Sequence, residues 1–475
     1  MATVYKTPGV YVEEIPKLPP SVAQVETAIP AFIGYTDIAT DADGTSLTLV
    51  PKRITSLLDY ERFFGKPQSE KITVTIKDTY KAGDILIDRQ ISAALTGSAS
   101  KHNMYYQLQM YFANGGGPCY IVSVGSYLTH GTTIDASATS DLKDGLDALE
   151  KADEPTLIVF PELATSGDTV AEINDLYDLA LAQCAKLGDR FTIIDCAADS
   201  YDNLRHATNG IGMNNLKYGA AYHPFLKTAL SYYFADADVT ISQTATGGTP
   251  PTPAFDAGTL AAIKTADLAL YNQVVSKIND LKMTLPPSAT VAGIYAAVDN
   301  SRGVWKAPAN VSVTLVSGLT NTITNTEQDG MNVDVTAGKS VNAIRAFAGK
   351  GILVWGGRTL AGNDNEWRYV SVRRFFNMVE ESTKKATEPF VFEPNDANTW
   401  VKVQAMIENF LTNLWRQGAL QGAKPEHAFY VAVGLGKTMT AVDILEGKMI
   451  VEIGMAVVRP AEFIILRFSH KMAES

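Results

Sequence analysis

The sequence predicts an α/β fold class, α+β over the whole chain, spread over several domains. Three observations support this. From about residue 104 strand-like and helix-like segments alternate, as in a mainly parallel sheet covered by helices. The chain has 475 residues, more than one ordinary domain of about 100–150 residues. Both ends also carry strand-like segments with no obvious pairing partner nearby in the sequence.

The first 19 residues read as an extended arm rather than as the start of a domain. Thr7-Pro8-Gly9 predicts a turn, and Val10-Tyr11-Val12 predicts a short strand of β-branched and aromatic residues. Pro16, Pro19 and Pro20 then end regular structure. A lone strand cannot satisfy its own backbone donors and acceptors. We therefore expect it to pair with a sheet of this subunit or of another.

The middle of the chain carries the α/β alternation. Residues 241–255, rich in Ser, Thr, Gly and Pro, predict a loop, and Pro286-Pro287 ends the amphipathic pattern that follows it. The expected helices are residues 104–114, 141–151, 170–187 and one long helix at 257–283, and the expected strands are 119–124, 156–160 and 191–196.

The C-terminal third changes character. A strand at 352–355 precedes helices at 373–385 and 397–417, and further strands are expected at 429–433, 449–458 and 463–468. Lys402 and Arg416 fall off the apolar stripe of the helix at 397–417. That stripe consists of Val403, Met406, Ile407, Phe410, Leu414 and Trp415. Edge strands left open at the margin of a fold are normally protected unless they pair with another chain.

Composition excludes several classes of protein. The net charge of −11 argues against a general nucleic-acid binder, although residues 345–475 are slightly basic, with 16 basic and 14 acidic side chains. No apolar run reaches the roughly 18 residues of a membrane span, and no secretory leader is recognisable at the N-terminus. Three cysteines, Cys119, Cys184 and Cys196, fit buried free thiols in a reducing compartment. We expect folding in the cytoplasm of the producing cell.

No motif supports an enzyme or a cofactor. Gly434-Leu435-Gly436-Lys437-Thr438 resembles the end of a phosphate-binding loop, but Val431 stands where the first glycine is needed, so we expect a turn between strands. Gly115-Gly116-Gly117 follows a helix instead of preceding one, and Asp41-Ala42-Asp43-Gly44 lacks two ligands of a calcium loop. Asp195 and Asp199, at a strand end, are expected to be solvated carboxylates. The six histidines show no metal spacing.

Several polar and aromatic blocks nevertheless stand out, in order along the chain. They begin with Pro8-Gly9-Val10-Tyr11-Val12-Glu13-Glu14 and end with Arg459-Pro460-Ala461-Glu462-Phe463-Ile464. With these blocks the chain resembles the sheath proteins of contractile phage tails and related contractile injection systems. The resemblance covers the N-terminus and most of residues 286–475, whereas residues 36–100 and 125–285 match only in general α/β character. The intervening blocks lie at 28–34, 115–122, 286–310, 342–374 and 392–396.

The resemblance implies a multi-domain sheath architecture and a structural function. Its parts would be an N-terminal arm (1–19), an outer α/β portion (20–345), a C-terminal assembly domain facing the tube (346–460) and a C-terminal arm (461–475). Six-subunit rings would stack around an inner tube in an extended state, and a signal from the baseplate would release contraction, which drives the tube through a membrane. The implied partners are copies of the chain, the inner tube protein, baseplate proteins and terminator or cap proteins. No nucleic acid, cofactor, metal or direct membrane insertion is implied.

The same resemblance places the arms on neighbouring subunits, where they complete a sheet. The arm strands would be Val10, Tyr11, Val12, Phe463, Ile464, Ile465, Leu466 and Phe468. For the tube contact we expect the helix at 397–417, with Lys402 and Arg416 facing an acidic tube. The alternative is a core-packed helix whose polar face is simply solvated.

Other interpretations remain open. The particle could be a phage tail, although the compact length and residues 19–30 favour a phage-tail-like injection system, assembled in the bacterial cytoplasm and either released or anchored to a membrane. A non-contractile shell subunit would form cylinders of a single length. An α/β NTPase or transferase is the enzyme alternative, and nucleotide binding would favour it.

Overall fold

The computed structural model describes residues 22–81, 85–130, 134–137, 141–247 and 254–467. These divide into two compact units. The large unit comprises Glu26–Met378 and the described residues from Arg459 onward, and the small unit comprises Val379–Val458 and the described residues up to Val25. The predicted arm strand Val10-Tyr11-Val12 and Phe468 lie outside the described residues.

A nine-stranded sheet forms the centre of the large unit. Its six inner strands, from β14 to β5, run parallel to one another, and β2, β15 and β12 are antiparallel additions at its edges. This confirms the mainly parallel sheet expected from the alternation of strands and helices. The spatial order is β12 (Val311–Ser312), β15 (Gly351–Val354), β14 (Val341–Phe347), β8 (Gly219–His223), β7 (Phe191–Asp195), β6 (Leu157–Val159), β1 (Pro30–Thr36), β5 (Cys119–Ser126) and β2 (Lys52–Ile54).

Each face of this sheet has its own apolar core, because alternate residues of a strand point to opposite sides. On β1, Ala31 and Ile33 join the core that includes α4 (Asp141–Leu149) and α5 (Val170–Leu187). Phe32 joins the opposite core, with α2 (Met104–Ala113) and α9 (Ser288–Arg302). Four further α-helices of the large unit are α1 (Leu57–Phe64), α3 (Tyr127–His130), α6 (Tyr201–Arg205) and α10 (Asn325–Asn332).

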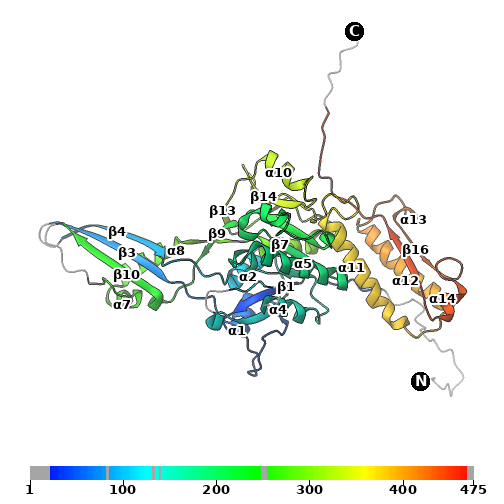
Figure 1. Cartoon of the computed structure of the whole chain (residues 1–475), viewed down its shortest axis with the longest axis horizontal. Coiled ribbons are helices and arrows are strands. Elements are labelled where there is room, and N and C mark those ends of the chain that lie inside the picture. Colours follow the sequence, from blue (N-terminus) through cyan, green and yellow to red (C-terminus); the bar gives the residue numbers. More distant parts are fainter. Residues whose placement is uncertain (1–21, 82–84, 131–133, 138–140, 248–253, 468–475) are drawn as a thin grey trace, which may run out of the picture. The chain divides into compact units, whose positions relative to one another are not determined.

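A separate three-stranded sheet extends from the large unit in the order β10 (Val239–Thr246), β3 (Ile72–Lys81) and β4 (Ile85–Leu95) (Figure 1). The expected single helix at 257–283 is wrong here. The chain instead forms α7 (Leu260–Ala266), α8 (Leu268–Asn279) and β11 (Lys282–Leu285). Asp267 has φ −145° and ψ 92°, and its side chain accepts a hydrogen bond from Leu270 N, so it ends one helix and caps the next. Strand β11 joins a third sheet with β9 (Leu226–Ser231) and β13 (Val316–Leu319).

The small unit is built around α12 (Ala397–Arg416) and the antiparallel hairpin of β16 (Phe429–Val433) and β17 (Val451–Met455). The short helices α13 (Pro425–Ala428) and α14 (Ala441–Leu445) lie along the chain between α12 and β17. Helix α11 (Val370–Thr387) begins in the large unit, and its residues from Val379 onward belong to the small unit.

Two expectations about the C-terminal third differ from the structure. The division expected at 345/346 falls inside β14, which pairs with both β8 and β15, so residues up to Met378 stay with the large unit. The strand expected at 463–468 is not formed by residues 463–467 in the single chain. A strand requires a partner backbone, and the described residues provide none there. The helices expected at 104–114, 170–187 and 397–417 are confirmed within one residue.

Candidate assembly site

The hairpin of the small unit has one covered and one open face. Val431 and Val433 are buried, at 7% and 4% exposure. On the opposite face, Tyr430 Oη donates to Glu452 Oε1 at 2.6 Å. The two strands pair along five residues, from Phe429 with Met455 to Val433 with Val451. Among the described residues no third strand joins this sheet.

Helix α12 presents an exposed stripe opposite its buried one. The expected core residues Val403, Met406, Ile407, Phe410 and Leu414 are buried, while Trp415 is half-buried. Lys402 and Arg416 are exposed and lie about four turns apart on the same side of the helix. The exposed residues between them on this stripe are Ala405, Asn409 and Asn413. The stripe therefore carries two positive and no negative charges.

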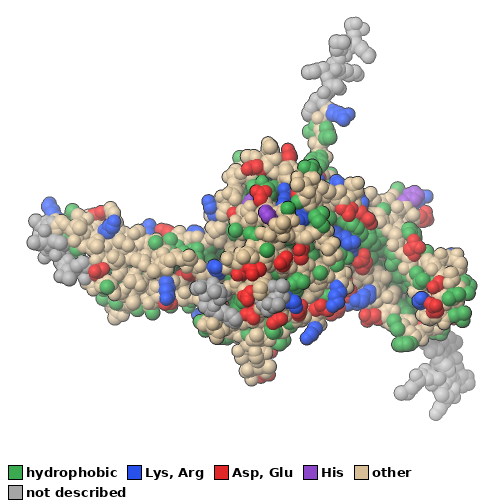
Figure 2. Space-filling view, viewed as in Figure 1, with side chains coloured by type: hydrophobic (Ala, Val, Ile, Leu, Met, Phe, Trp, Pro, Cys, Tyr) green, Lys and Arg blue, Asp and Glu red, His purple; other side chains and the backbone are tan. Residues whose placement is uncertain are grey.

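The sign of this stripe differs from that of the chain as a whole. The net charge is −11, and acidic side chains gather over the large unit on the face shown in Figure 2. Among the described residues, Lys402 and Arg416 take part in no ion pair. The exposure of both residues is compatible with a tube contact and equally with a solvated polar face. The hypothesis stays a prediction.

The C-terminal segment exposes four consecutive large apolar side chains. Phe463, Ile464, Ile465 and Leu466 are 71%, 80%, 77% and 73% exposed. They belong to a segment that leads away from the rest of the large unit (Figures 1 and 2). Scattered exposed apolar residues are ordinary, but a contiguous apolar run marks an interaction site. The sequence prediction of an arm at these positions agrees with this exposure.

In the loop that resembles a phosphate-binding loop, most backbone N–H groups are already used by hydrogen bonds within the loop. The N–H groups of Lys437, Thr438 and Met439 all point to Gly434 O, and Gly436 N donates to Met439 O. The segment is therefore a turn, as expected.

The expectation that Asp195 is a solvated carboxylate is wrong. Asp195 is 1% exposed rather than solvated, because the start of α9 covers the end of β7 and Ser288 N donates to Asp195 Oδ1 at 2.8 Å. Burial raises the pKa of its carboxyl to about 7. Asp199 accepts hydrogen bonds from Phe225 N and Thr320 Oγ1. Both carboxylates therefore hold loops of the large unit together.

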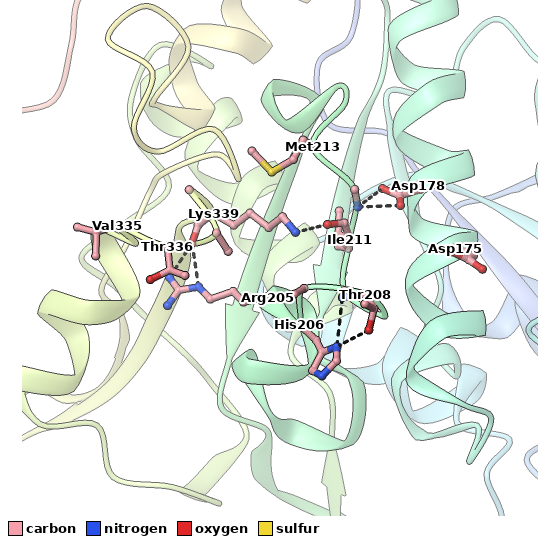
Figure 3. Close-up of a pocket in the computed structure, with 15 residues that line it drawn as sticks. Asp175, Asp178, Arg205, His206, Thr208, Ile211, Met213, Val335, Thr336 and Lys339 are labelled. Carbon is pink, nitrogen blue, oxygen red and sulfur yellow. Dashed lines mark hydrogen bonds between the residues drawn. The ribbon is translucent and has the colours of Figure 1, made fainter.

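A pocket of about 700 Å³ opens in the large unit between residues 205–213 and 335–339 (Figure 3). Three of its charged side chains, those of Asp178, Arg205 and Lys339, are hydrogen-bonded to the backbone of these loops. Lys339 Nζ donates to Ile211 O, and Asp178 accepts from Gly212 N at 2.8 Å. Arg205 Nε donates to Lys339 O at 2.9 Å. These contacts join the loops, and within the described ranges no group of His, Cys, Asp and Glu could hold a metal ion.

The three cysteines are free and buried, as expected. Burial raises the pKa of each thiol, so the unreactive protonated form dominates. No helix within the described part of the chain is long and apolar enough to cross a membrane.

Comparison with known proteins assigns the family. Residues 362–471 match the family model of the phage tail sheath C-terminal domain. Over its whole length the chain resembles a chain in the 6-fold symmetrised baseplate structure of the anti-feeding prophage (AFP). The two share 32% sequence identity with a TM-score of 0.63, over 99% of this chain and 100% of the other. The chain belongs to the contractile tail sheath proteins.

The sheath protein also resembles a chain of the PVC sheath complex, an extracellular contractile injection system solved in the contracted state. The identity is 30% and the TM-score 0.62, over 99% of both chains. It is 25% identical to the tail sheath protein of Vibrio phage KVP40 over 150 residues, which is 32% of this chain and 22% of that relative. The match thus spans about a fifth of this curated relative. The role of the present chain is that of a structural sheath subunit.

Sequence reasoning missed one feature of this site. Glu462, in front of the exposed apolar run, forms a partly buried ion pair with Arg358. The two residues are 104 positions apart, so no local spacing could reveal the pair. The only signal was that each lies in a block that resembles the sheath family.

Proposed function

We propose that this sheath protein assembles into six-membered rings that stack around an inner tube in a metastable extended state. Contraction then drives the tube through a target membrane. The AFP baseplate relative comes from a 6-fold symmetrised structure, and the PVC relative from a sheath in the contracted state. Both relatives match the entire chain.

Two features of the single chain support the proposal: a two-stranded sheet that could receive a further strand, and a C-terminal segment that could provide one. In the single chain the two are not paired with each other. Within the described residues, the hairpin β16–β17 has no third strand, and the exposed apolar residues 463–466 belong to no ladder. A strand added to a sheet edge binds through main-chain hydrogen bonds. When such a contact does not close on itself, it builds a helical array. The C-terminal arm, and the N-terminal arm with Val10, Tyr11 and Val12, would supply the missing strands to neighbouring hairpins.

An injection system is favoured over a phage tail. The whole-chain matches at 30–32% identity are to AFP and PVC, whereas the phage relative matches over only 32% of this chain. Expected partners are further copies, an inner tube with an acidic surface, baseplate proteins and a cap protein. Nucleic acid and cofactors have no role in the proposal. The subunit would assemble in the bacterial cytoplasm as part of a phage-tail-like particle.

Contraction in this proposal uses no nucleotide. The extended sheath would be trapped kinetically and would move to a better-packed arrangement when released. Roughly a few kcal/mol gained per subunit on repacking is the scale of a modest interface change. Summed over many subunits, this supplies the mechanical work. The backbone N–H groups used up in the loop at Gly434–Thr438 agree with an absence of ATP chemistry there.

Electron microscopy of the purified chain, alone and with its tube protein, tests the proposal. We expect striated hollow cylinders from the chain alone, and longer, narrower cylinders around the tube. Globular particles in both samples would contradict assembly, and cylinders of one length only would favour a non-contractile shell. ATP binding by calorimetry would favour the NTPase alternative.

Two truncations test the arms directly. Deletion of residues 463–475 removes side chains that are exposed in the single chain, so the product should fold with an unchanged circular dichroism spectrum. It should nevertheless fail to form cylinders. Deletion of residues 1–16 should have the same effect. Normal cylinders from either truncation would contradict strand exchange by that arm.

A further inference from the structure

The C-terminal segment is fixed to the large unit by a partly buried ion pair. Arg358 Nε and Nη2 donate to the two carboxylate oxygens of Glu462 at 2.9 and 2.6 Å. The side chain of Arg358 is 3% exposed and that of Glu462 21%. Tyr369 Oη donates to the same carboxylate at 3.2 Å. A bidentate Arg–carboxylate pair is strong and fixes direction as well as distance.

The pair lies where the chain leaves the large unit. Arg459 Nη1 donates to Asn365 O at 2.8 Å, three residues before Glu462. The very next residue, Phe463, is 71% exposed, and Leu466 is still 73% exposed. Contacts with the large unit therefore end at Glu462, and the apolar run begins there without a spacer.

The N-terminal side of the chain is fixed differently. Val25 N donates to Ser382 Oγ at 3.1 Å, and both residues belong to the small unit. The large unit begins one residue later, where Thr27 O accepts from Arg374 Nη2 at 2.8 Å. The described residues 22–25 thus belong with the small unit, whereas the described residues from Arg459 to Arg467 belong with the large unit. The hairpin that offers open strand edges belongs to the small unit.

We propose that the Arg358–Glu462 pair is the root of the C-terminal arm, and that this arm joins the large unit of one subunit to the small unit of a second copy. The inference rests on the proposed strand exchange. Glu462 is then a positioning residue: it sets where and in which direction the apolar run leaves, and a pull on the arm passes through its carboxylate into Arg358. The N-terminal arm would join small units to one another.

Glu462→Ala tests this role. It should raise the protein concentration needed for cylinder formation at least tenfold, as measured by pelleting and electron microscopy. Glu462→Gln keeps one acceptor for Arg358 and should give an intermediate value. Because the alanine variant leaves a buried guanidinium unpaired, the double variant Arg358→Met with Glu462→Met is made as well. It should fold with wild-type thermal stability and still fail to assemble.

A matched control separates positioning from stability. Asp78 accepts the same bidentate pair of bonds from Arg89, at 2.6 and 2.9 Å, in the sheet of β3 and β4. Asp78→Ala should lower the melting temperature as Glu462→Ala does, yet form normal cylinders. Mixed one to ten with the wild type, Glu462→Ala should shorten the cylinders severalfold, because it accepts a strand but donates one poorly. Asp78→Ala should leave their length unchanged.

The outcomes are distinct. Wild-type assembly by both the Glu462→Ala and the double Met variants would contradict the proposal that the Arg358–Glu462 pair positions the C-terminal arm. Equal shortening of the cylinders by the Asp78→Ala control would contradict it as well. Failure of the wild type itself to form cylinders would instead overturn the proposed function.

Discussion

The ring of Tyr430 lies directly over Gly454, its partner across the hairpin of β16 and β17. A Cβ atom on residue 454 would stand 2.1 Å from Tyr430 Cε1, closer than any van der Waals contact. The aromatic ring thus covers a strand position that has no side chain of its own. The hydroxyl of the same ring donates a hydrogen bond to Glu452. The position of the Tyr430 ring therefore shapes the open face of the hairpin.

Gly454→Ala should displace Tyr430 and distort the face that receives neighbouring strands. Because the Tyr430 side chain is 53% exposed and can turn aside, we expect a loss of at most about 1 kcal/mol in the free energy of unfolding, the low end of the cost of overpacking, together with impaired cylinder formation. Denaturant unfolding and pelleting measure the two effects. The double variant with Tyr430→Ala removes the clash and should recover most of the stability. If Gly454→Ala alone behaves as the wild type, the ring does not constrain the hairpin.

Local patterns in the sequence predict most of the fold. The helices at 104–114 and 170–187 are both predicted from their sequences. For α5 the structure also shows why the helix begins and ends where it does: Thr169 is its N-cap and Gly188 its C-cap. The break at Asp267 was missed because the apolar period continues through it, and only the capping bond to Leu270 shows that a second helix starts there.

The site was only partly predictable, for a different reason. The exposed stripe of α12 follows from helical period alone. The burial of Asp195 depends on α9, whose Ser288 is 93 residues away, and the arm root joins residues 104 positions apart. Contacts of this kind depend on topology, which local patterns do not contain. The resemblance of the surrounding blocks to the sheath family indicates that these regions matter, but not which side chains meet.

Reversing the charges on α12 should weaken the tube contact. In the variant Lys402→Glu with Arg416→Glu, the exposed stripe becomes acidic and should repel an acidic tube. We expect tube co-sedimentation to fall at least tenfold at low salt. The wild-type contact itself should weaken as salt rises, because exposed charges are screened beyond about 10 Å at 0.1 M.

Lys424→Glu with Lys437→Glu, which makes the same charge change off the stripe, is the control. Tube binding at the wild-type level by the α12 variant would show that another surface contacts the tube.

Lys437→Ala should have no effect on assembly or contraction. Its loop resembles a nucleotide-binding sequence, but the backbone N–H groups that would hold a phosphate donate to Gly434 O instead. Calorimetry with ATP and Mg²⁺ should detect no binding to the wild type or the variant. Saturable ATP binding that is lost in Lys437→Ala would contradict the assignment of this segment as a structural turn.

Asp195→Asn should stabilise the large unit at neutral and alkaline pH. The pKa of this buried carboxyl is about 7 in the folded chain, against 3.8 ordinarily, so the folded state binds the proton more tightly than the unfolded state does. The contribution of this group therefore lowers the free energy of unfolding as pH rises from about 4 to about 7, and then levels off. An amide retains the acceptor for Ser288 N and carries no charge. We expect a gain of about 1–3 kcal/mol at pH 8 and little change at pH 4.5, measured by urea unfolding at both values. Asp59, half-buried and with its pKa lowered chiefly by the hydrogen bond from the Thr55 side chain, is the control: Asp59→Asn should shift stability in the opposite direction at pH 8. An Asp195→Asn variant as pH-dependent as the wild type would show that this carboxyl titrates normally in the folded chain.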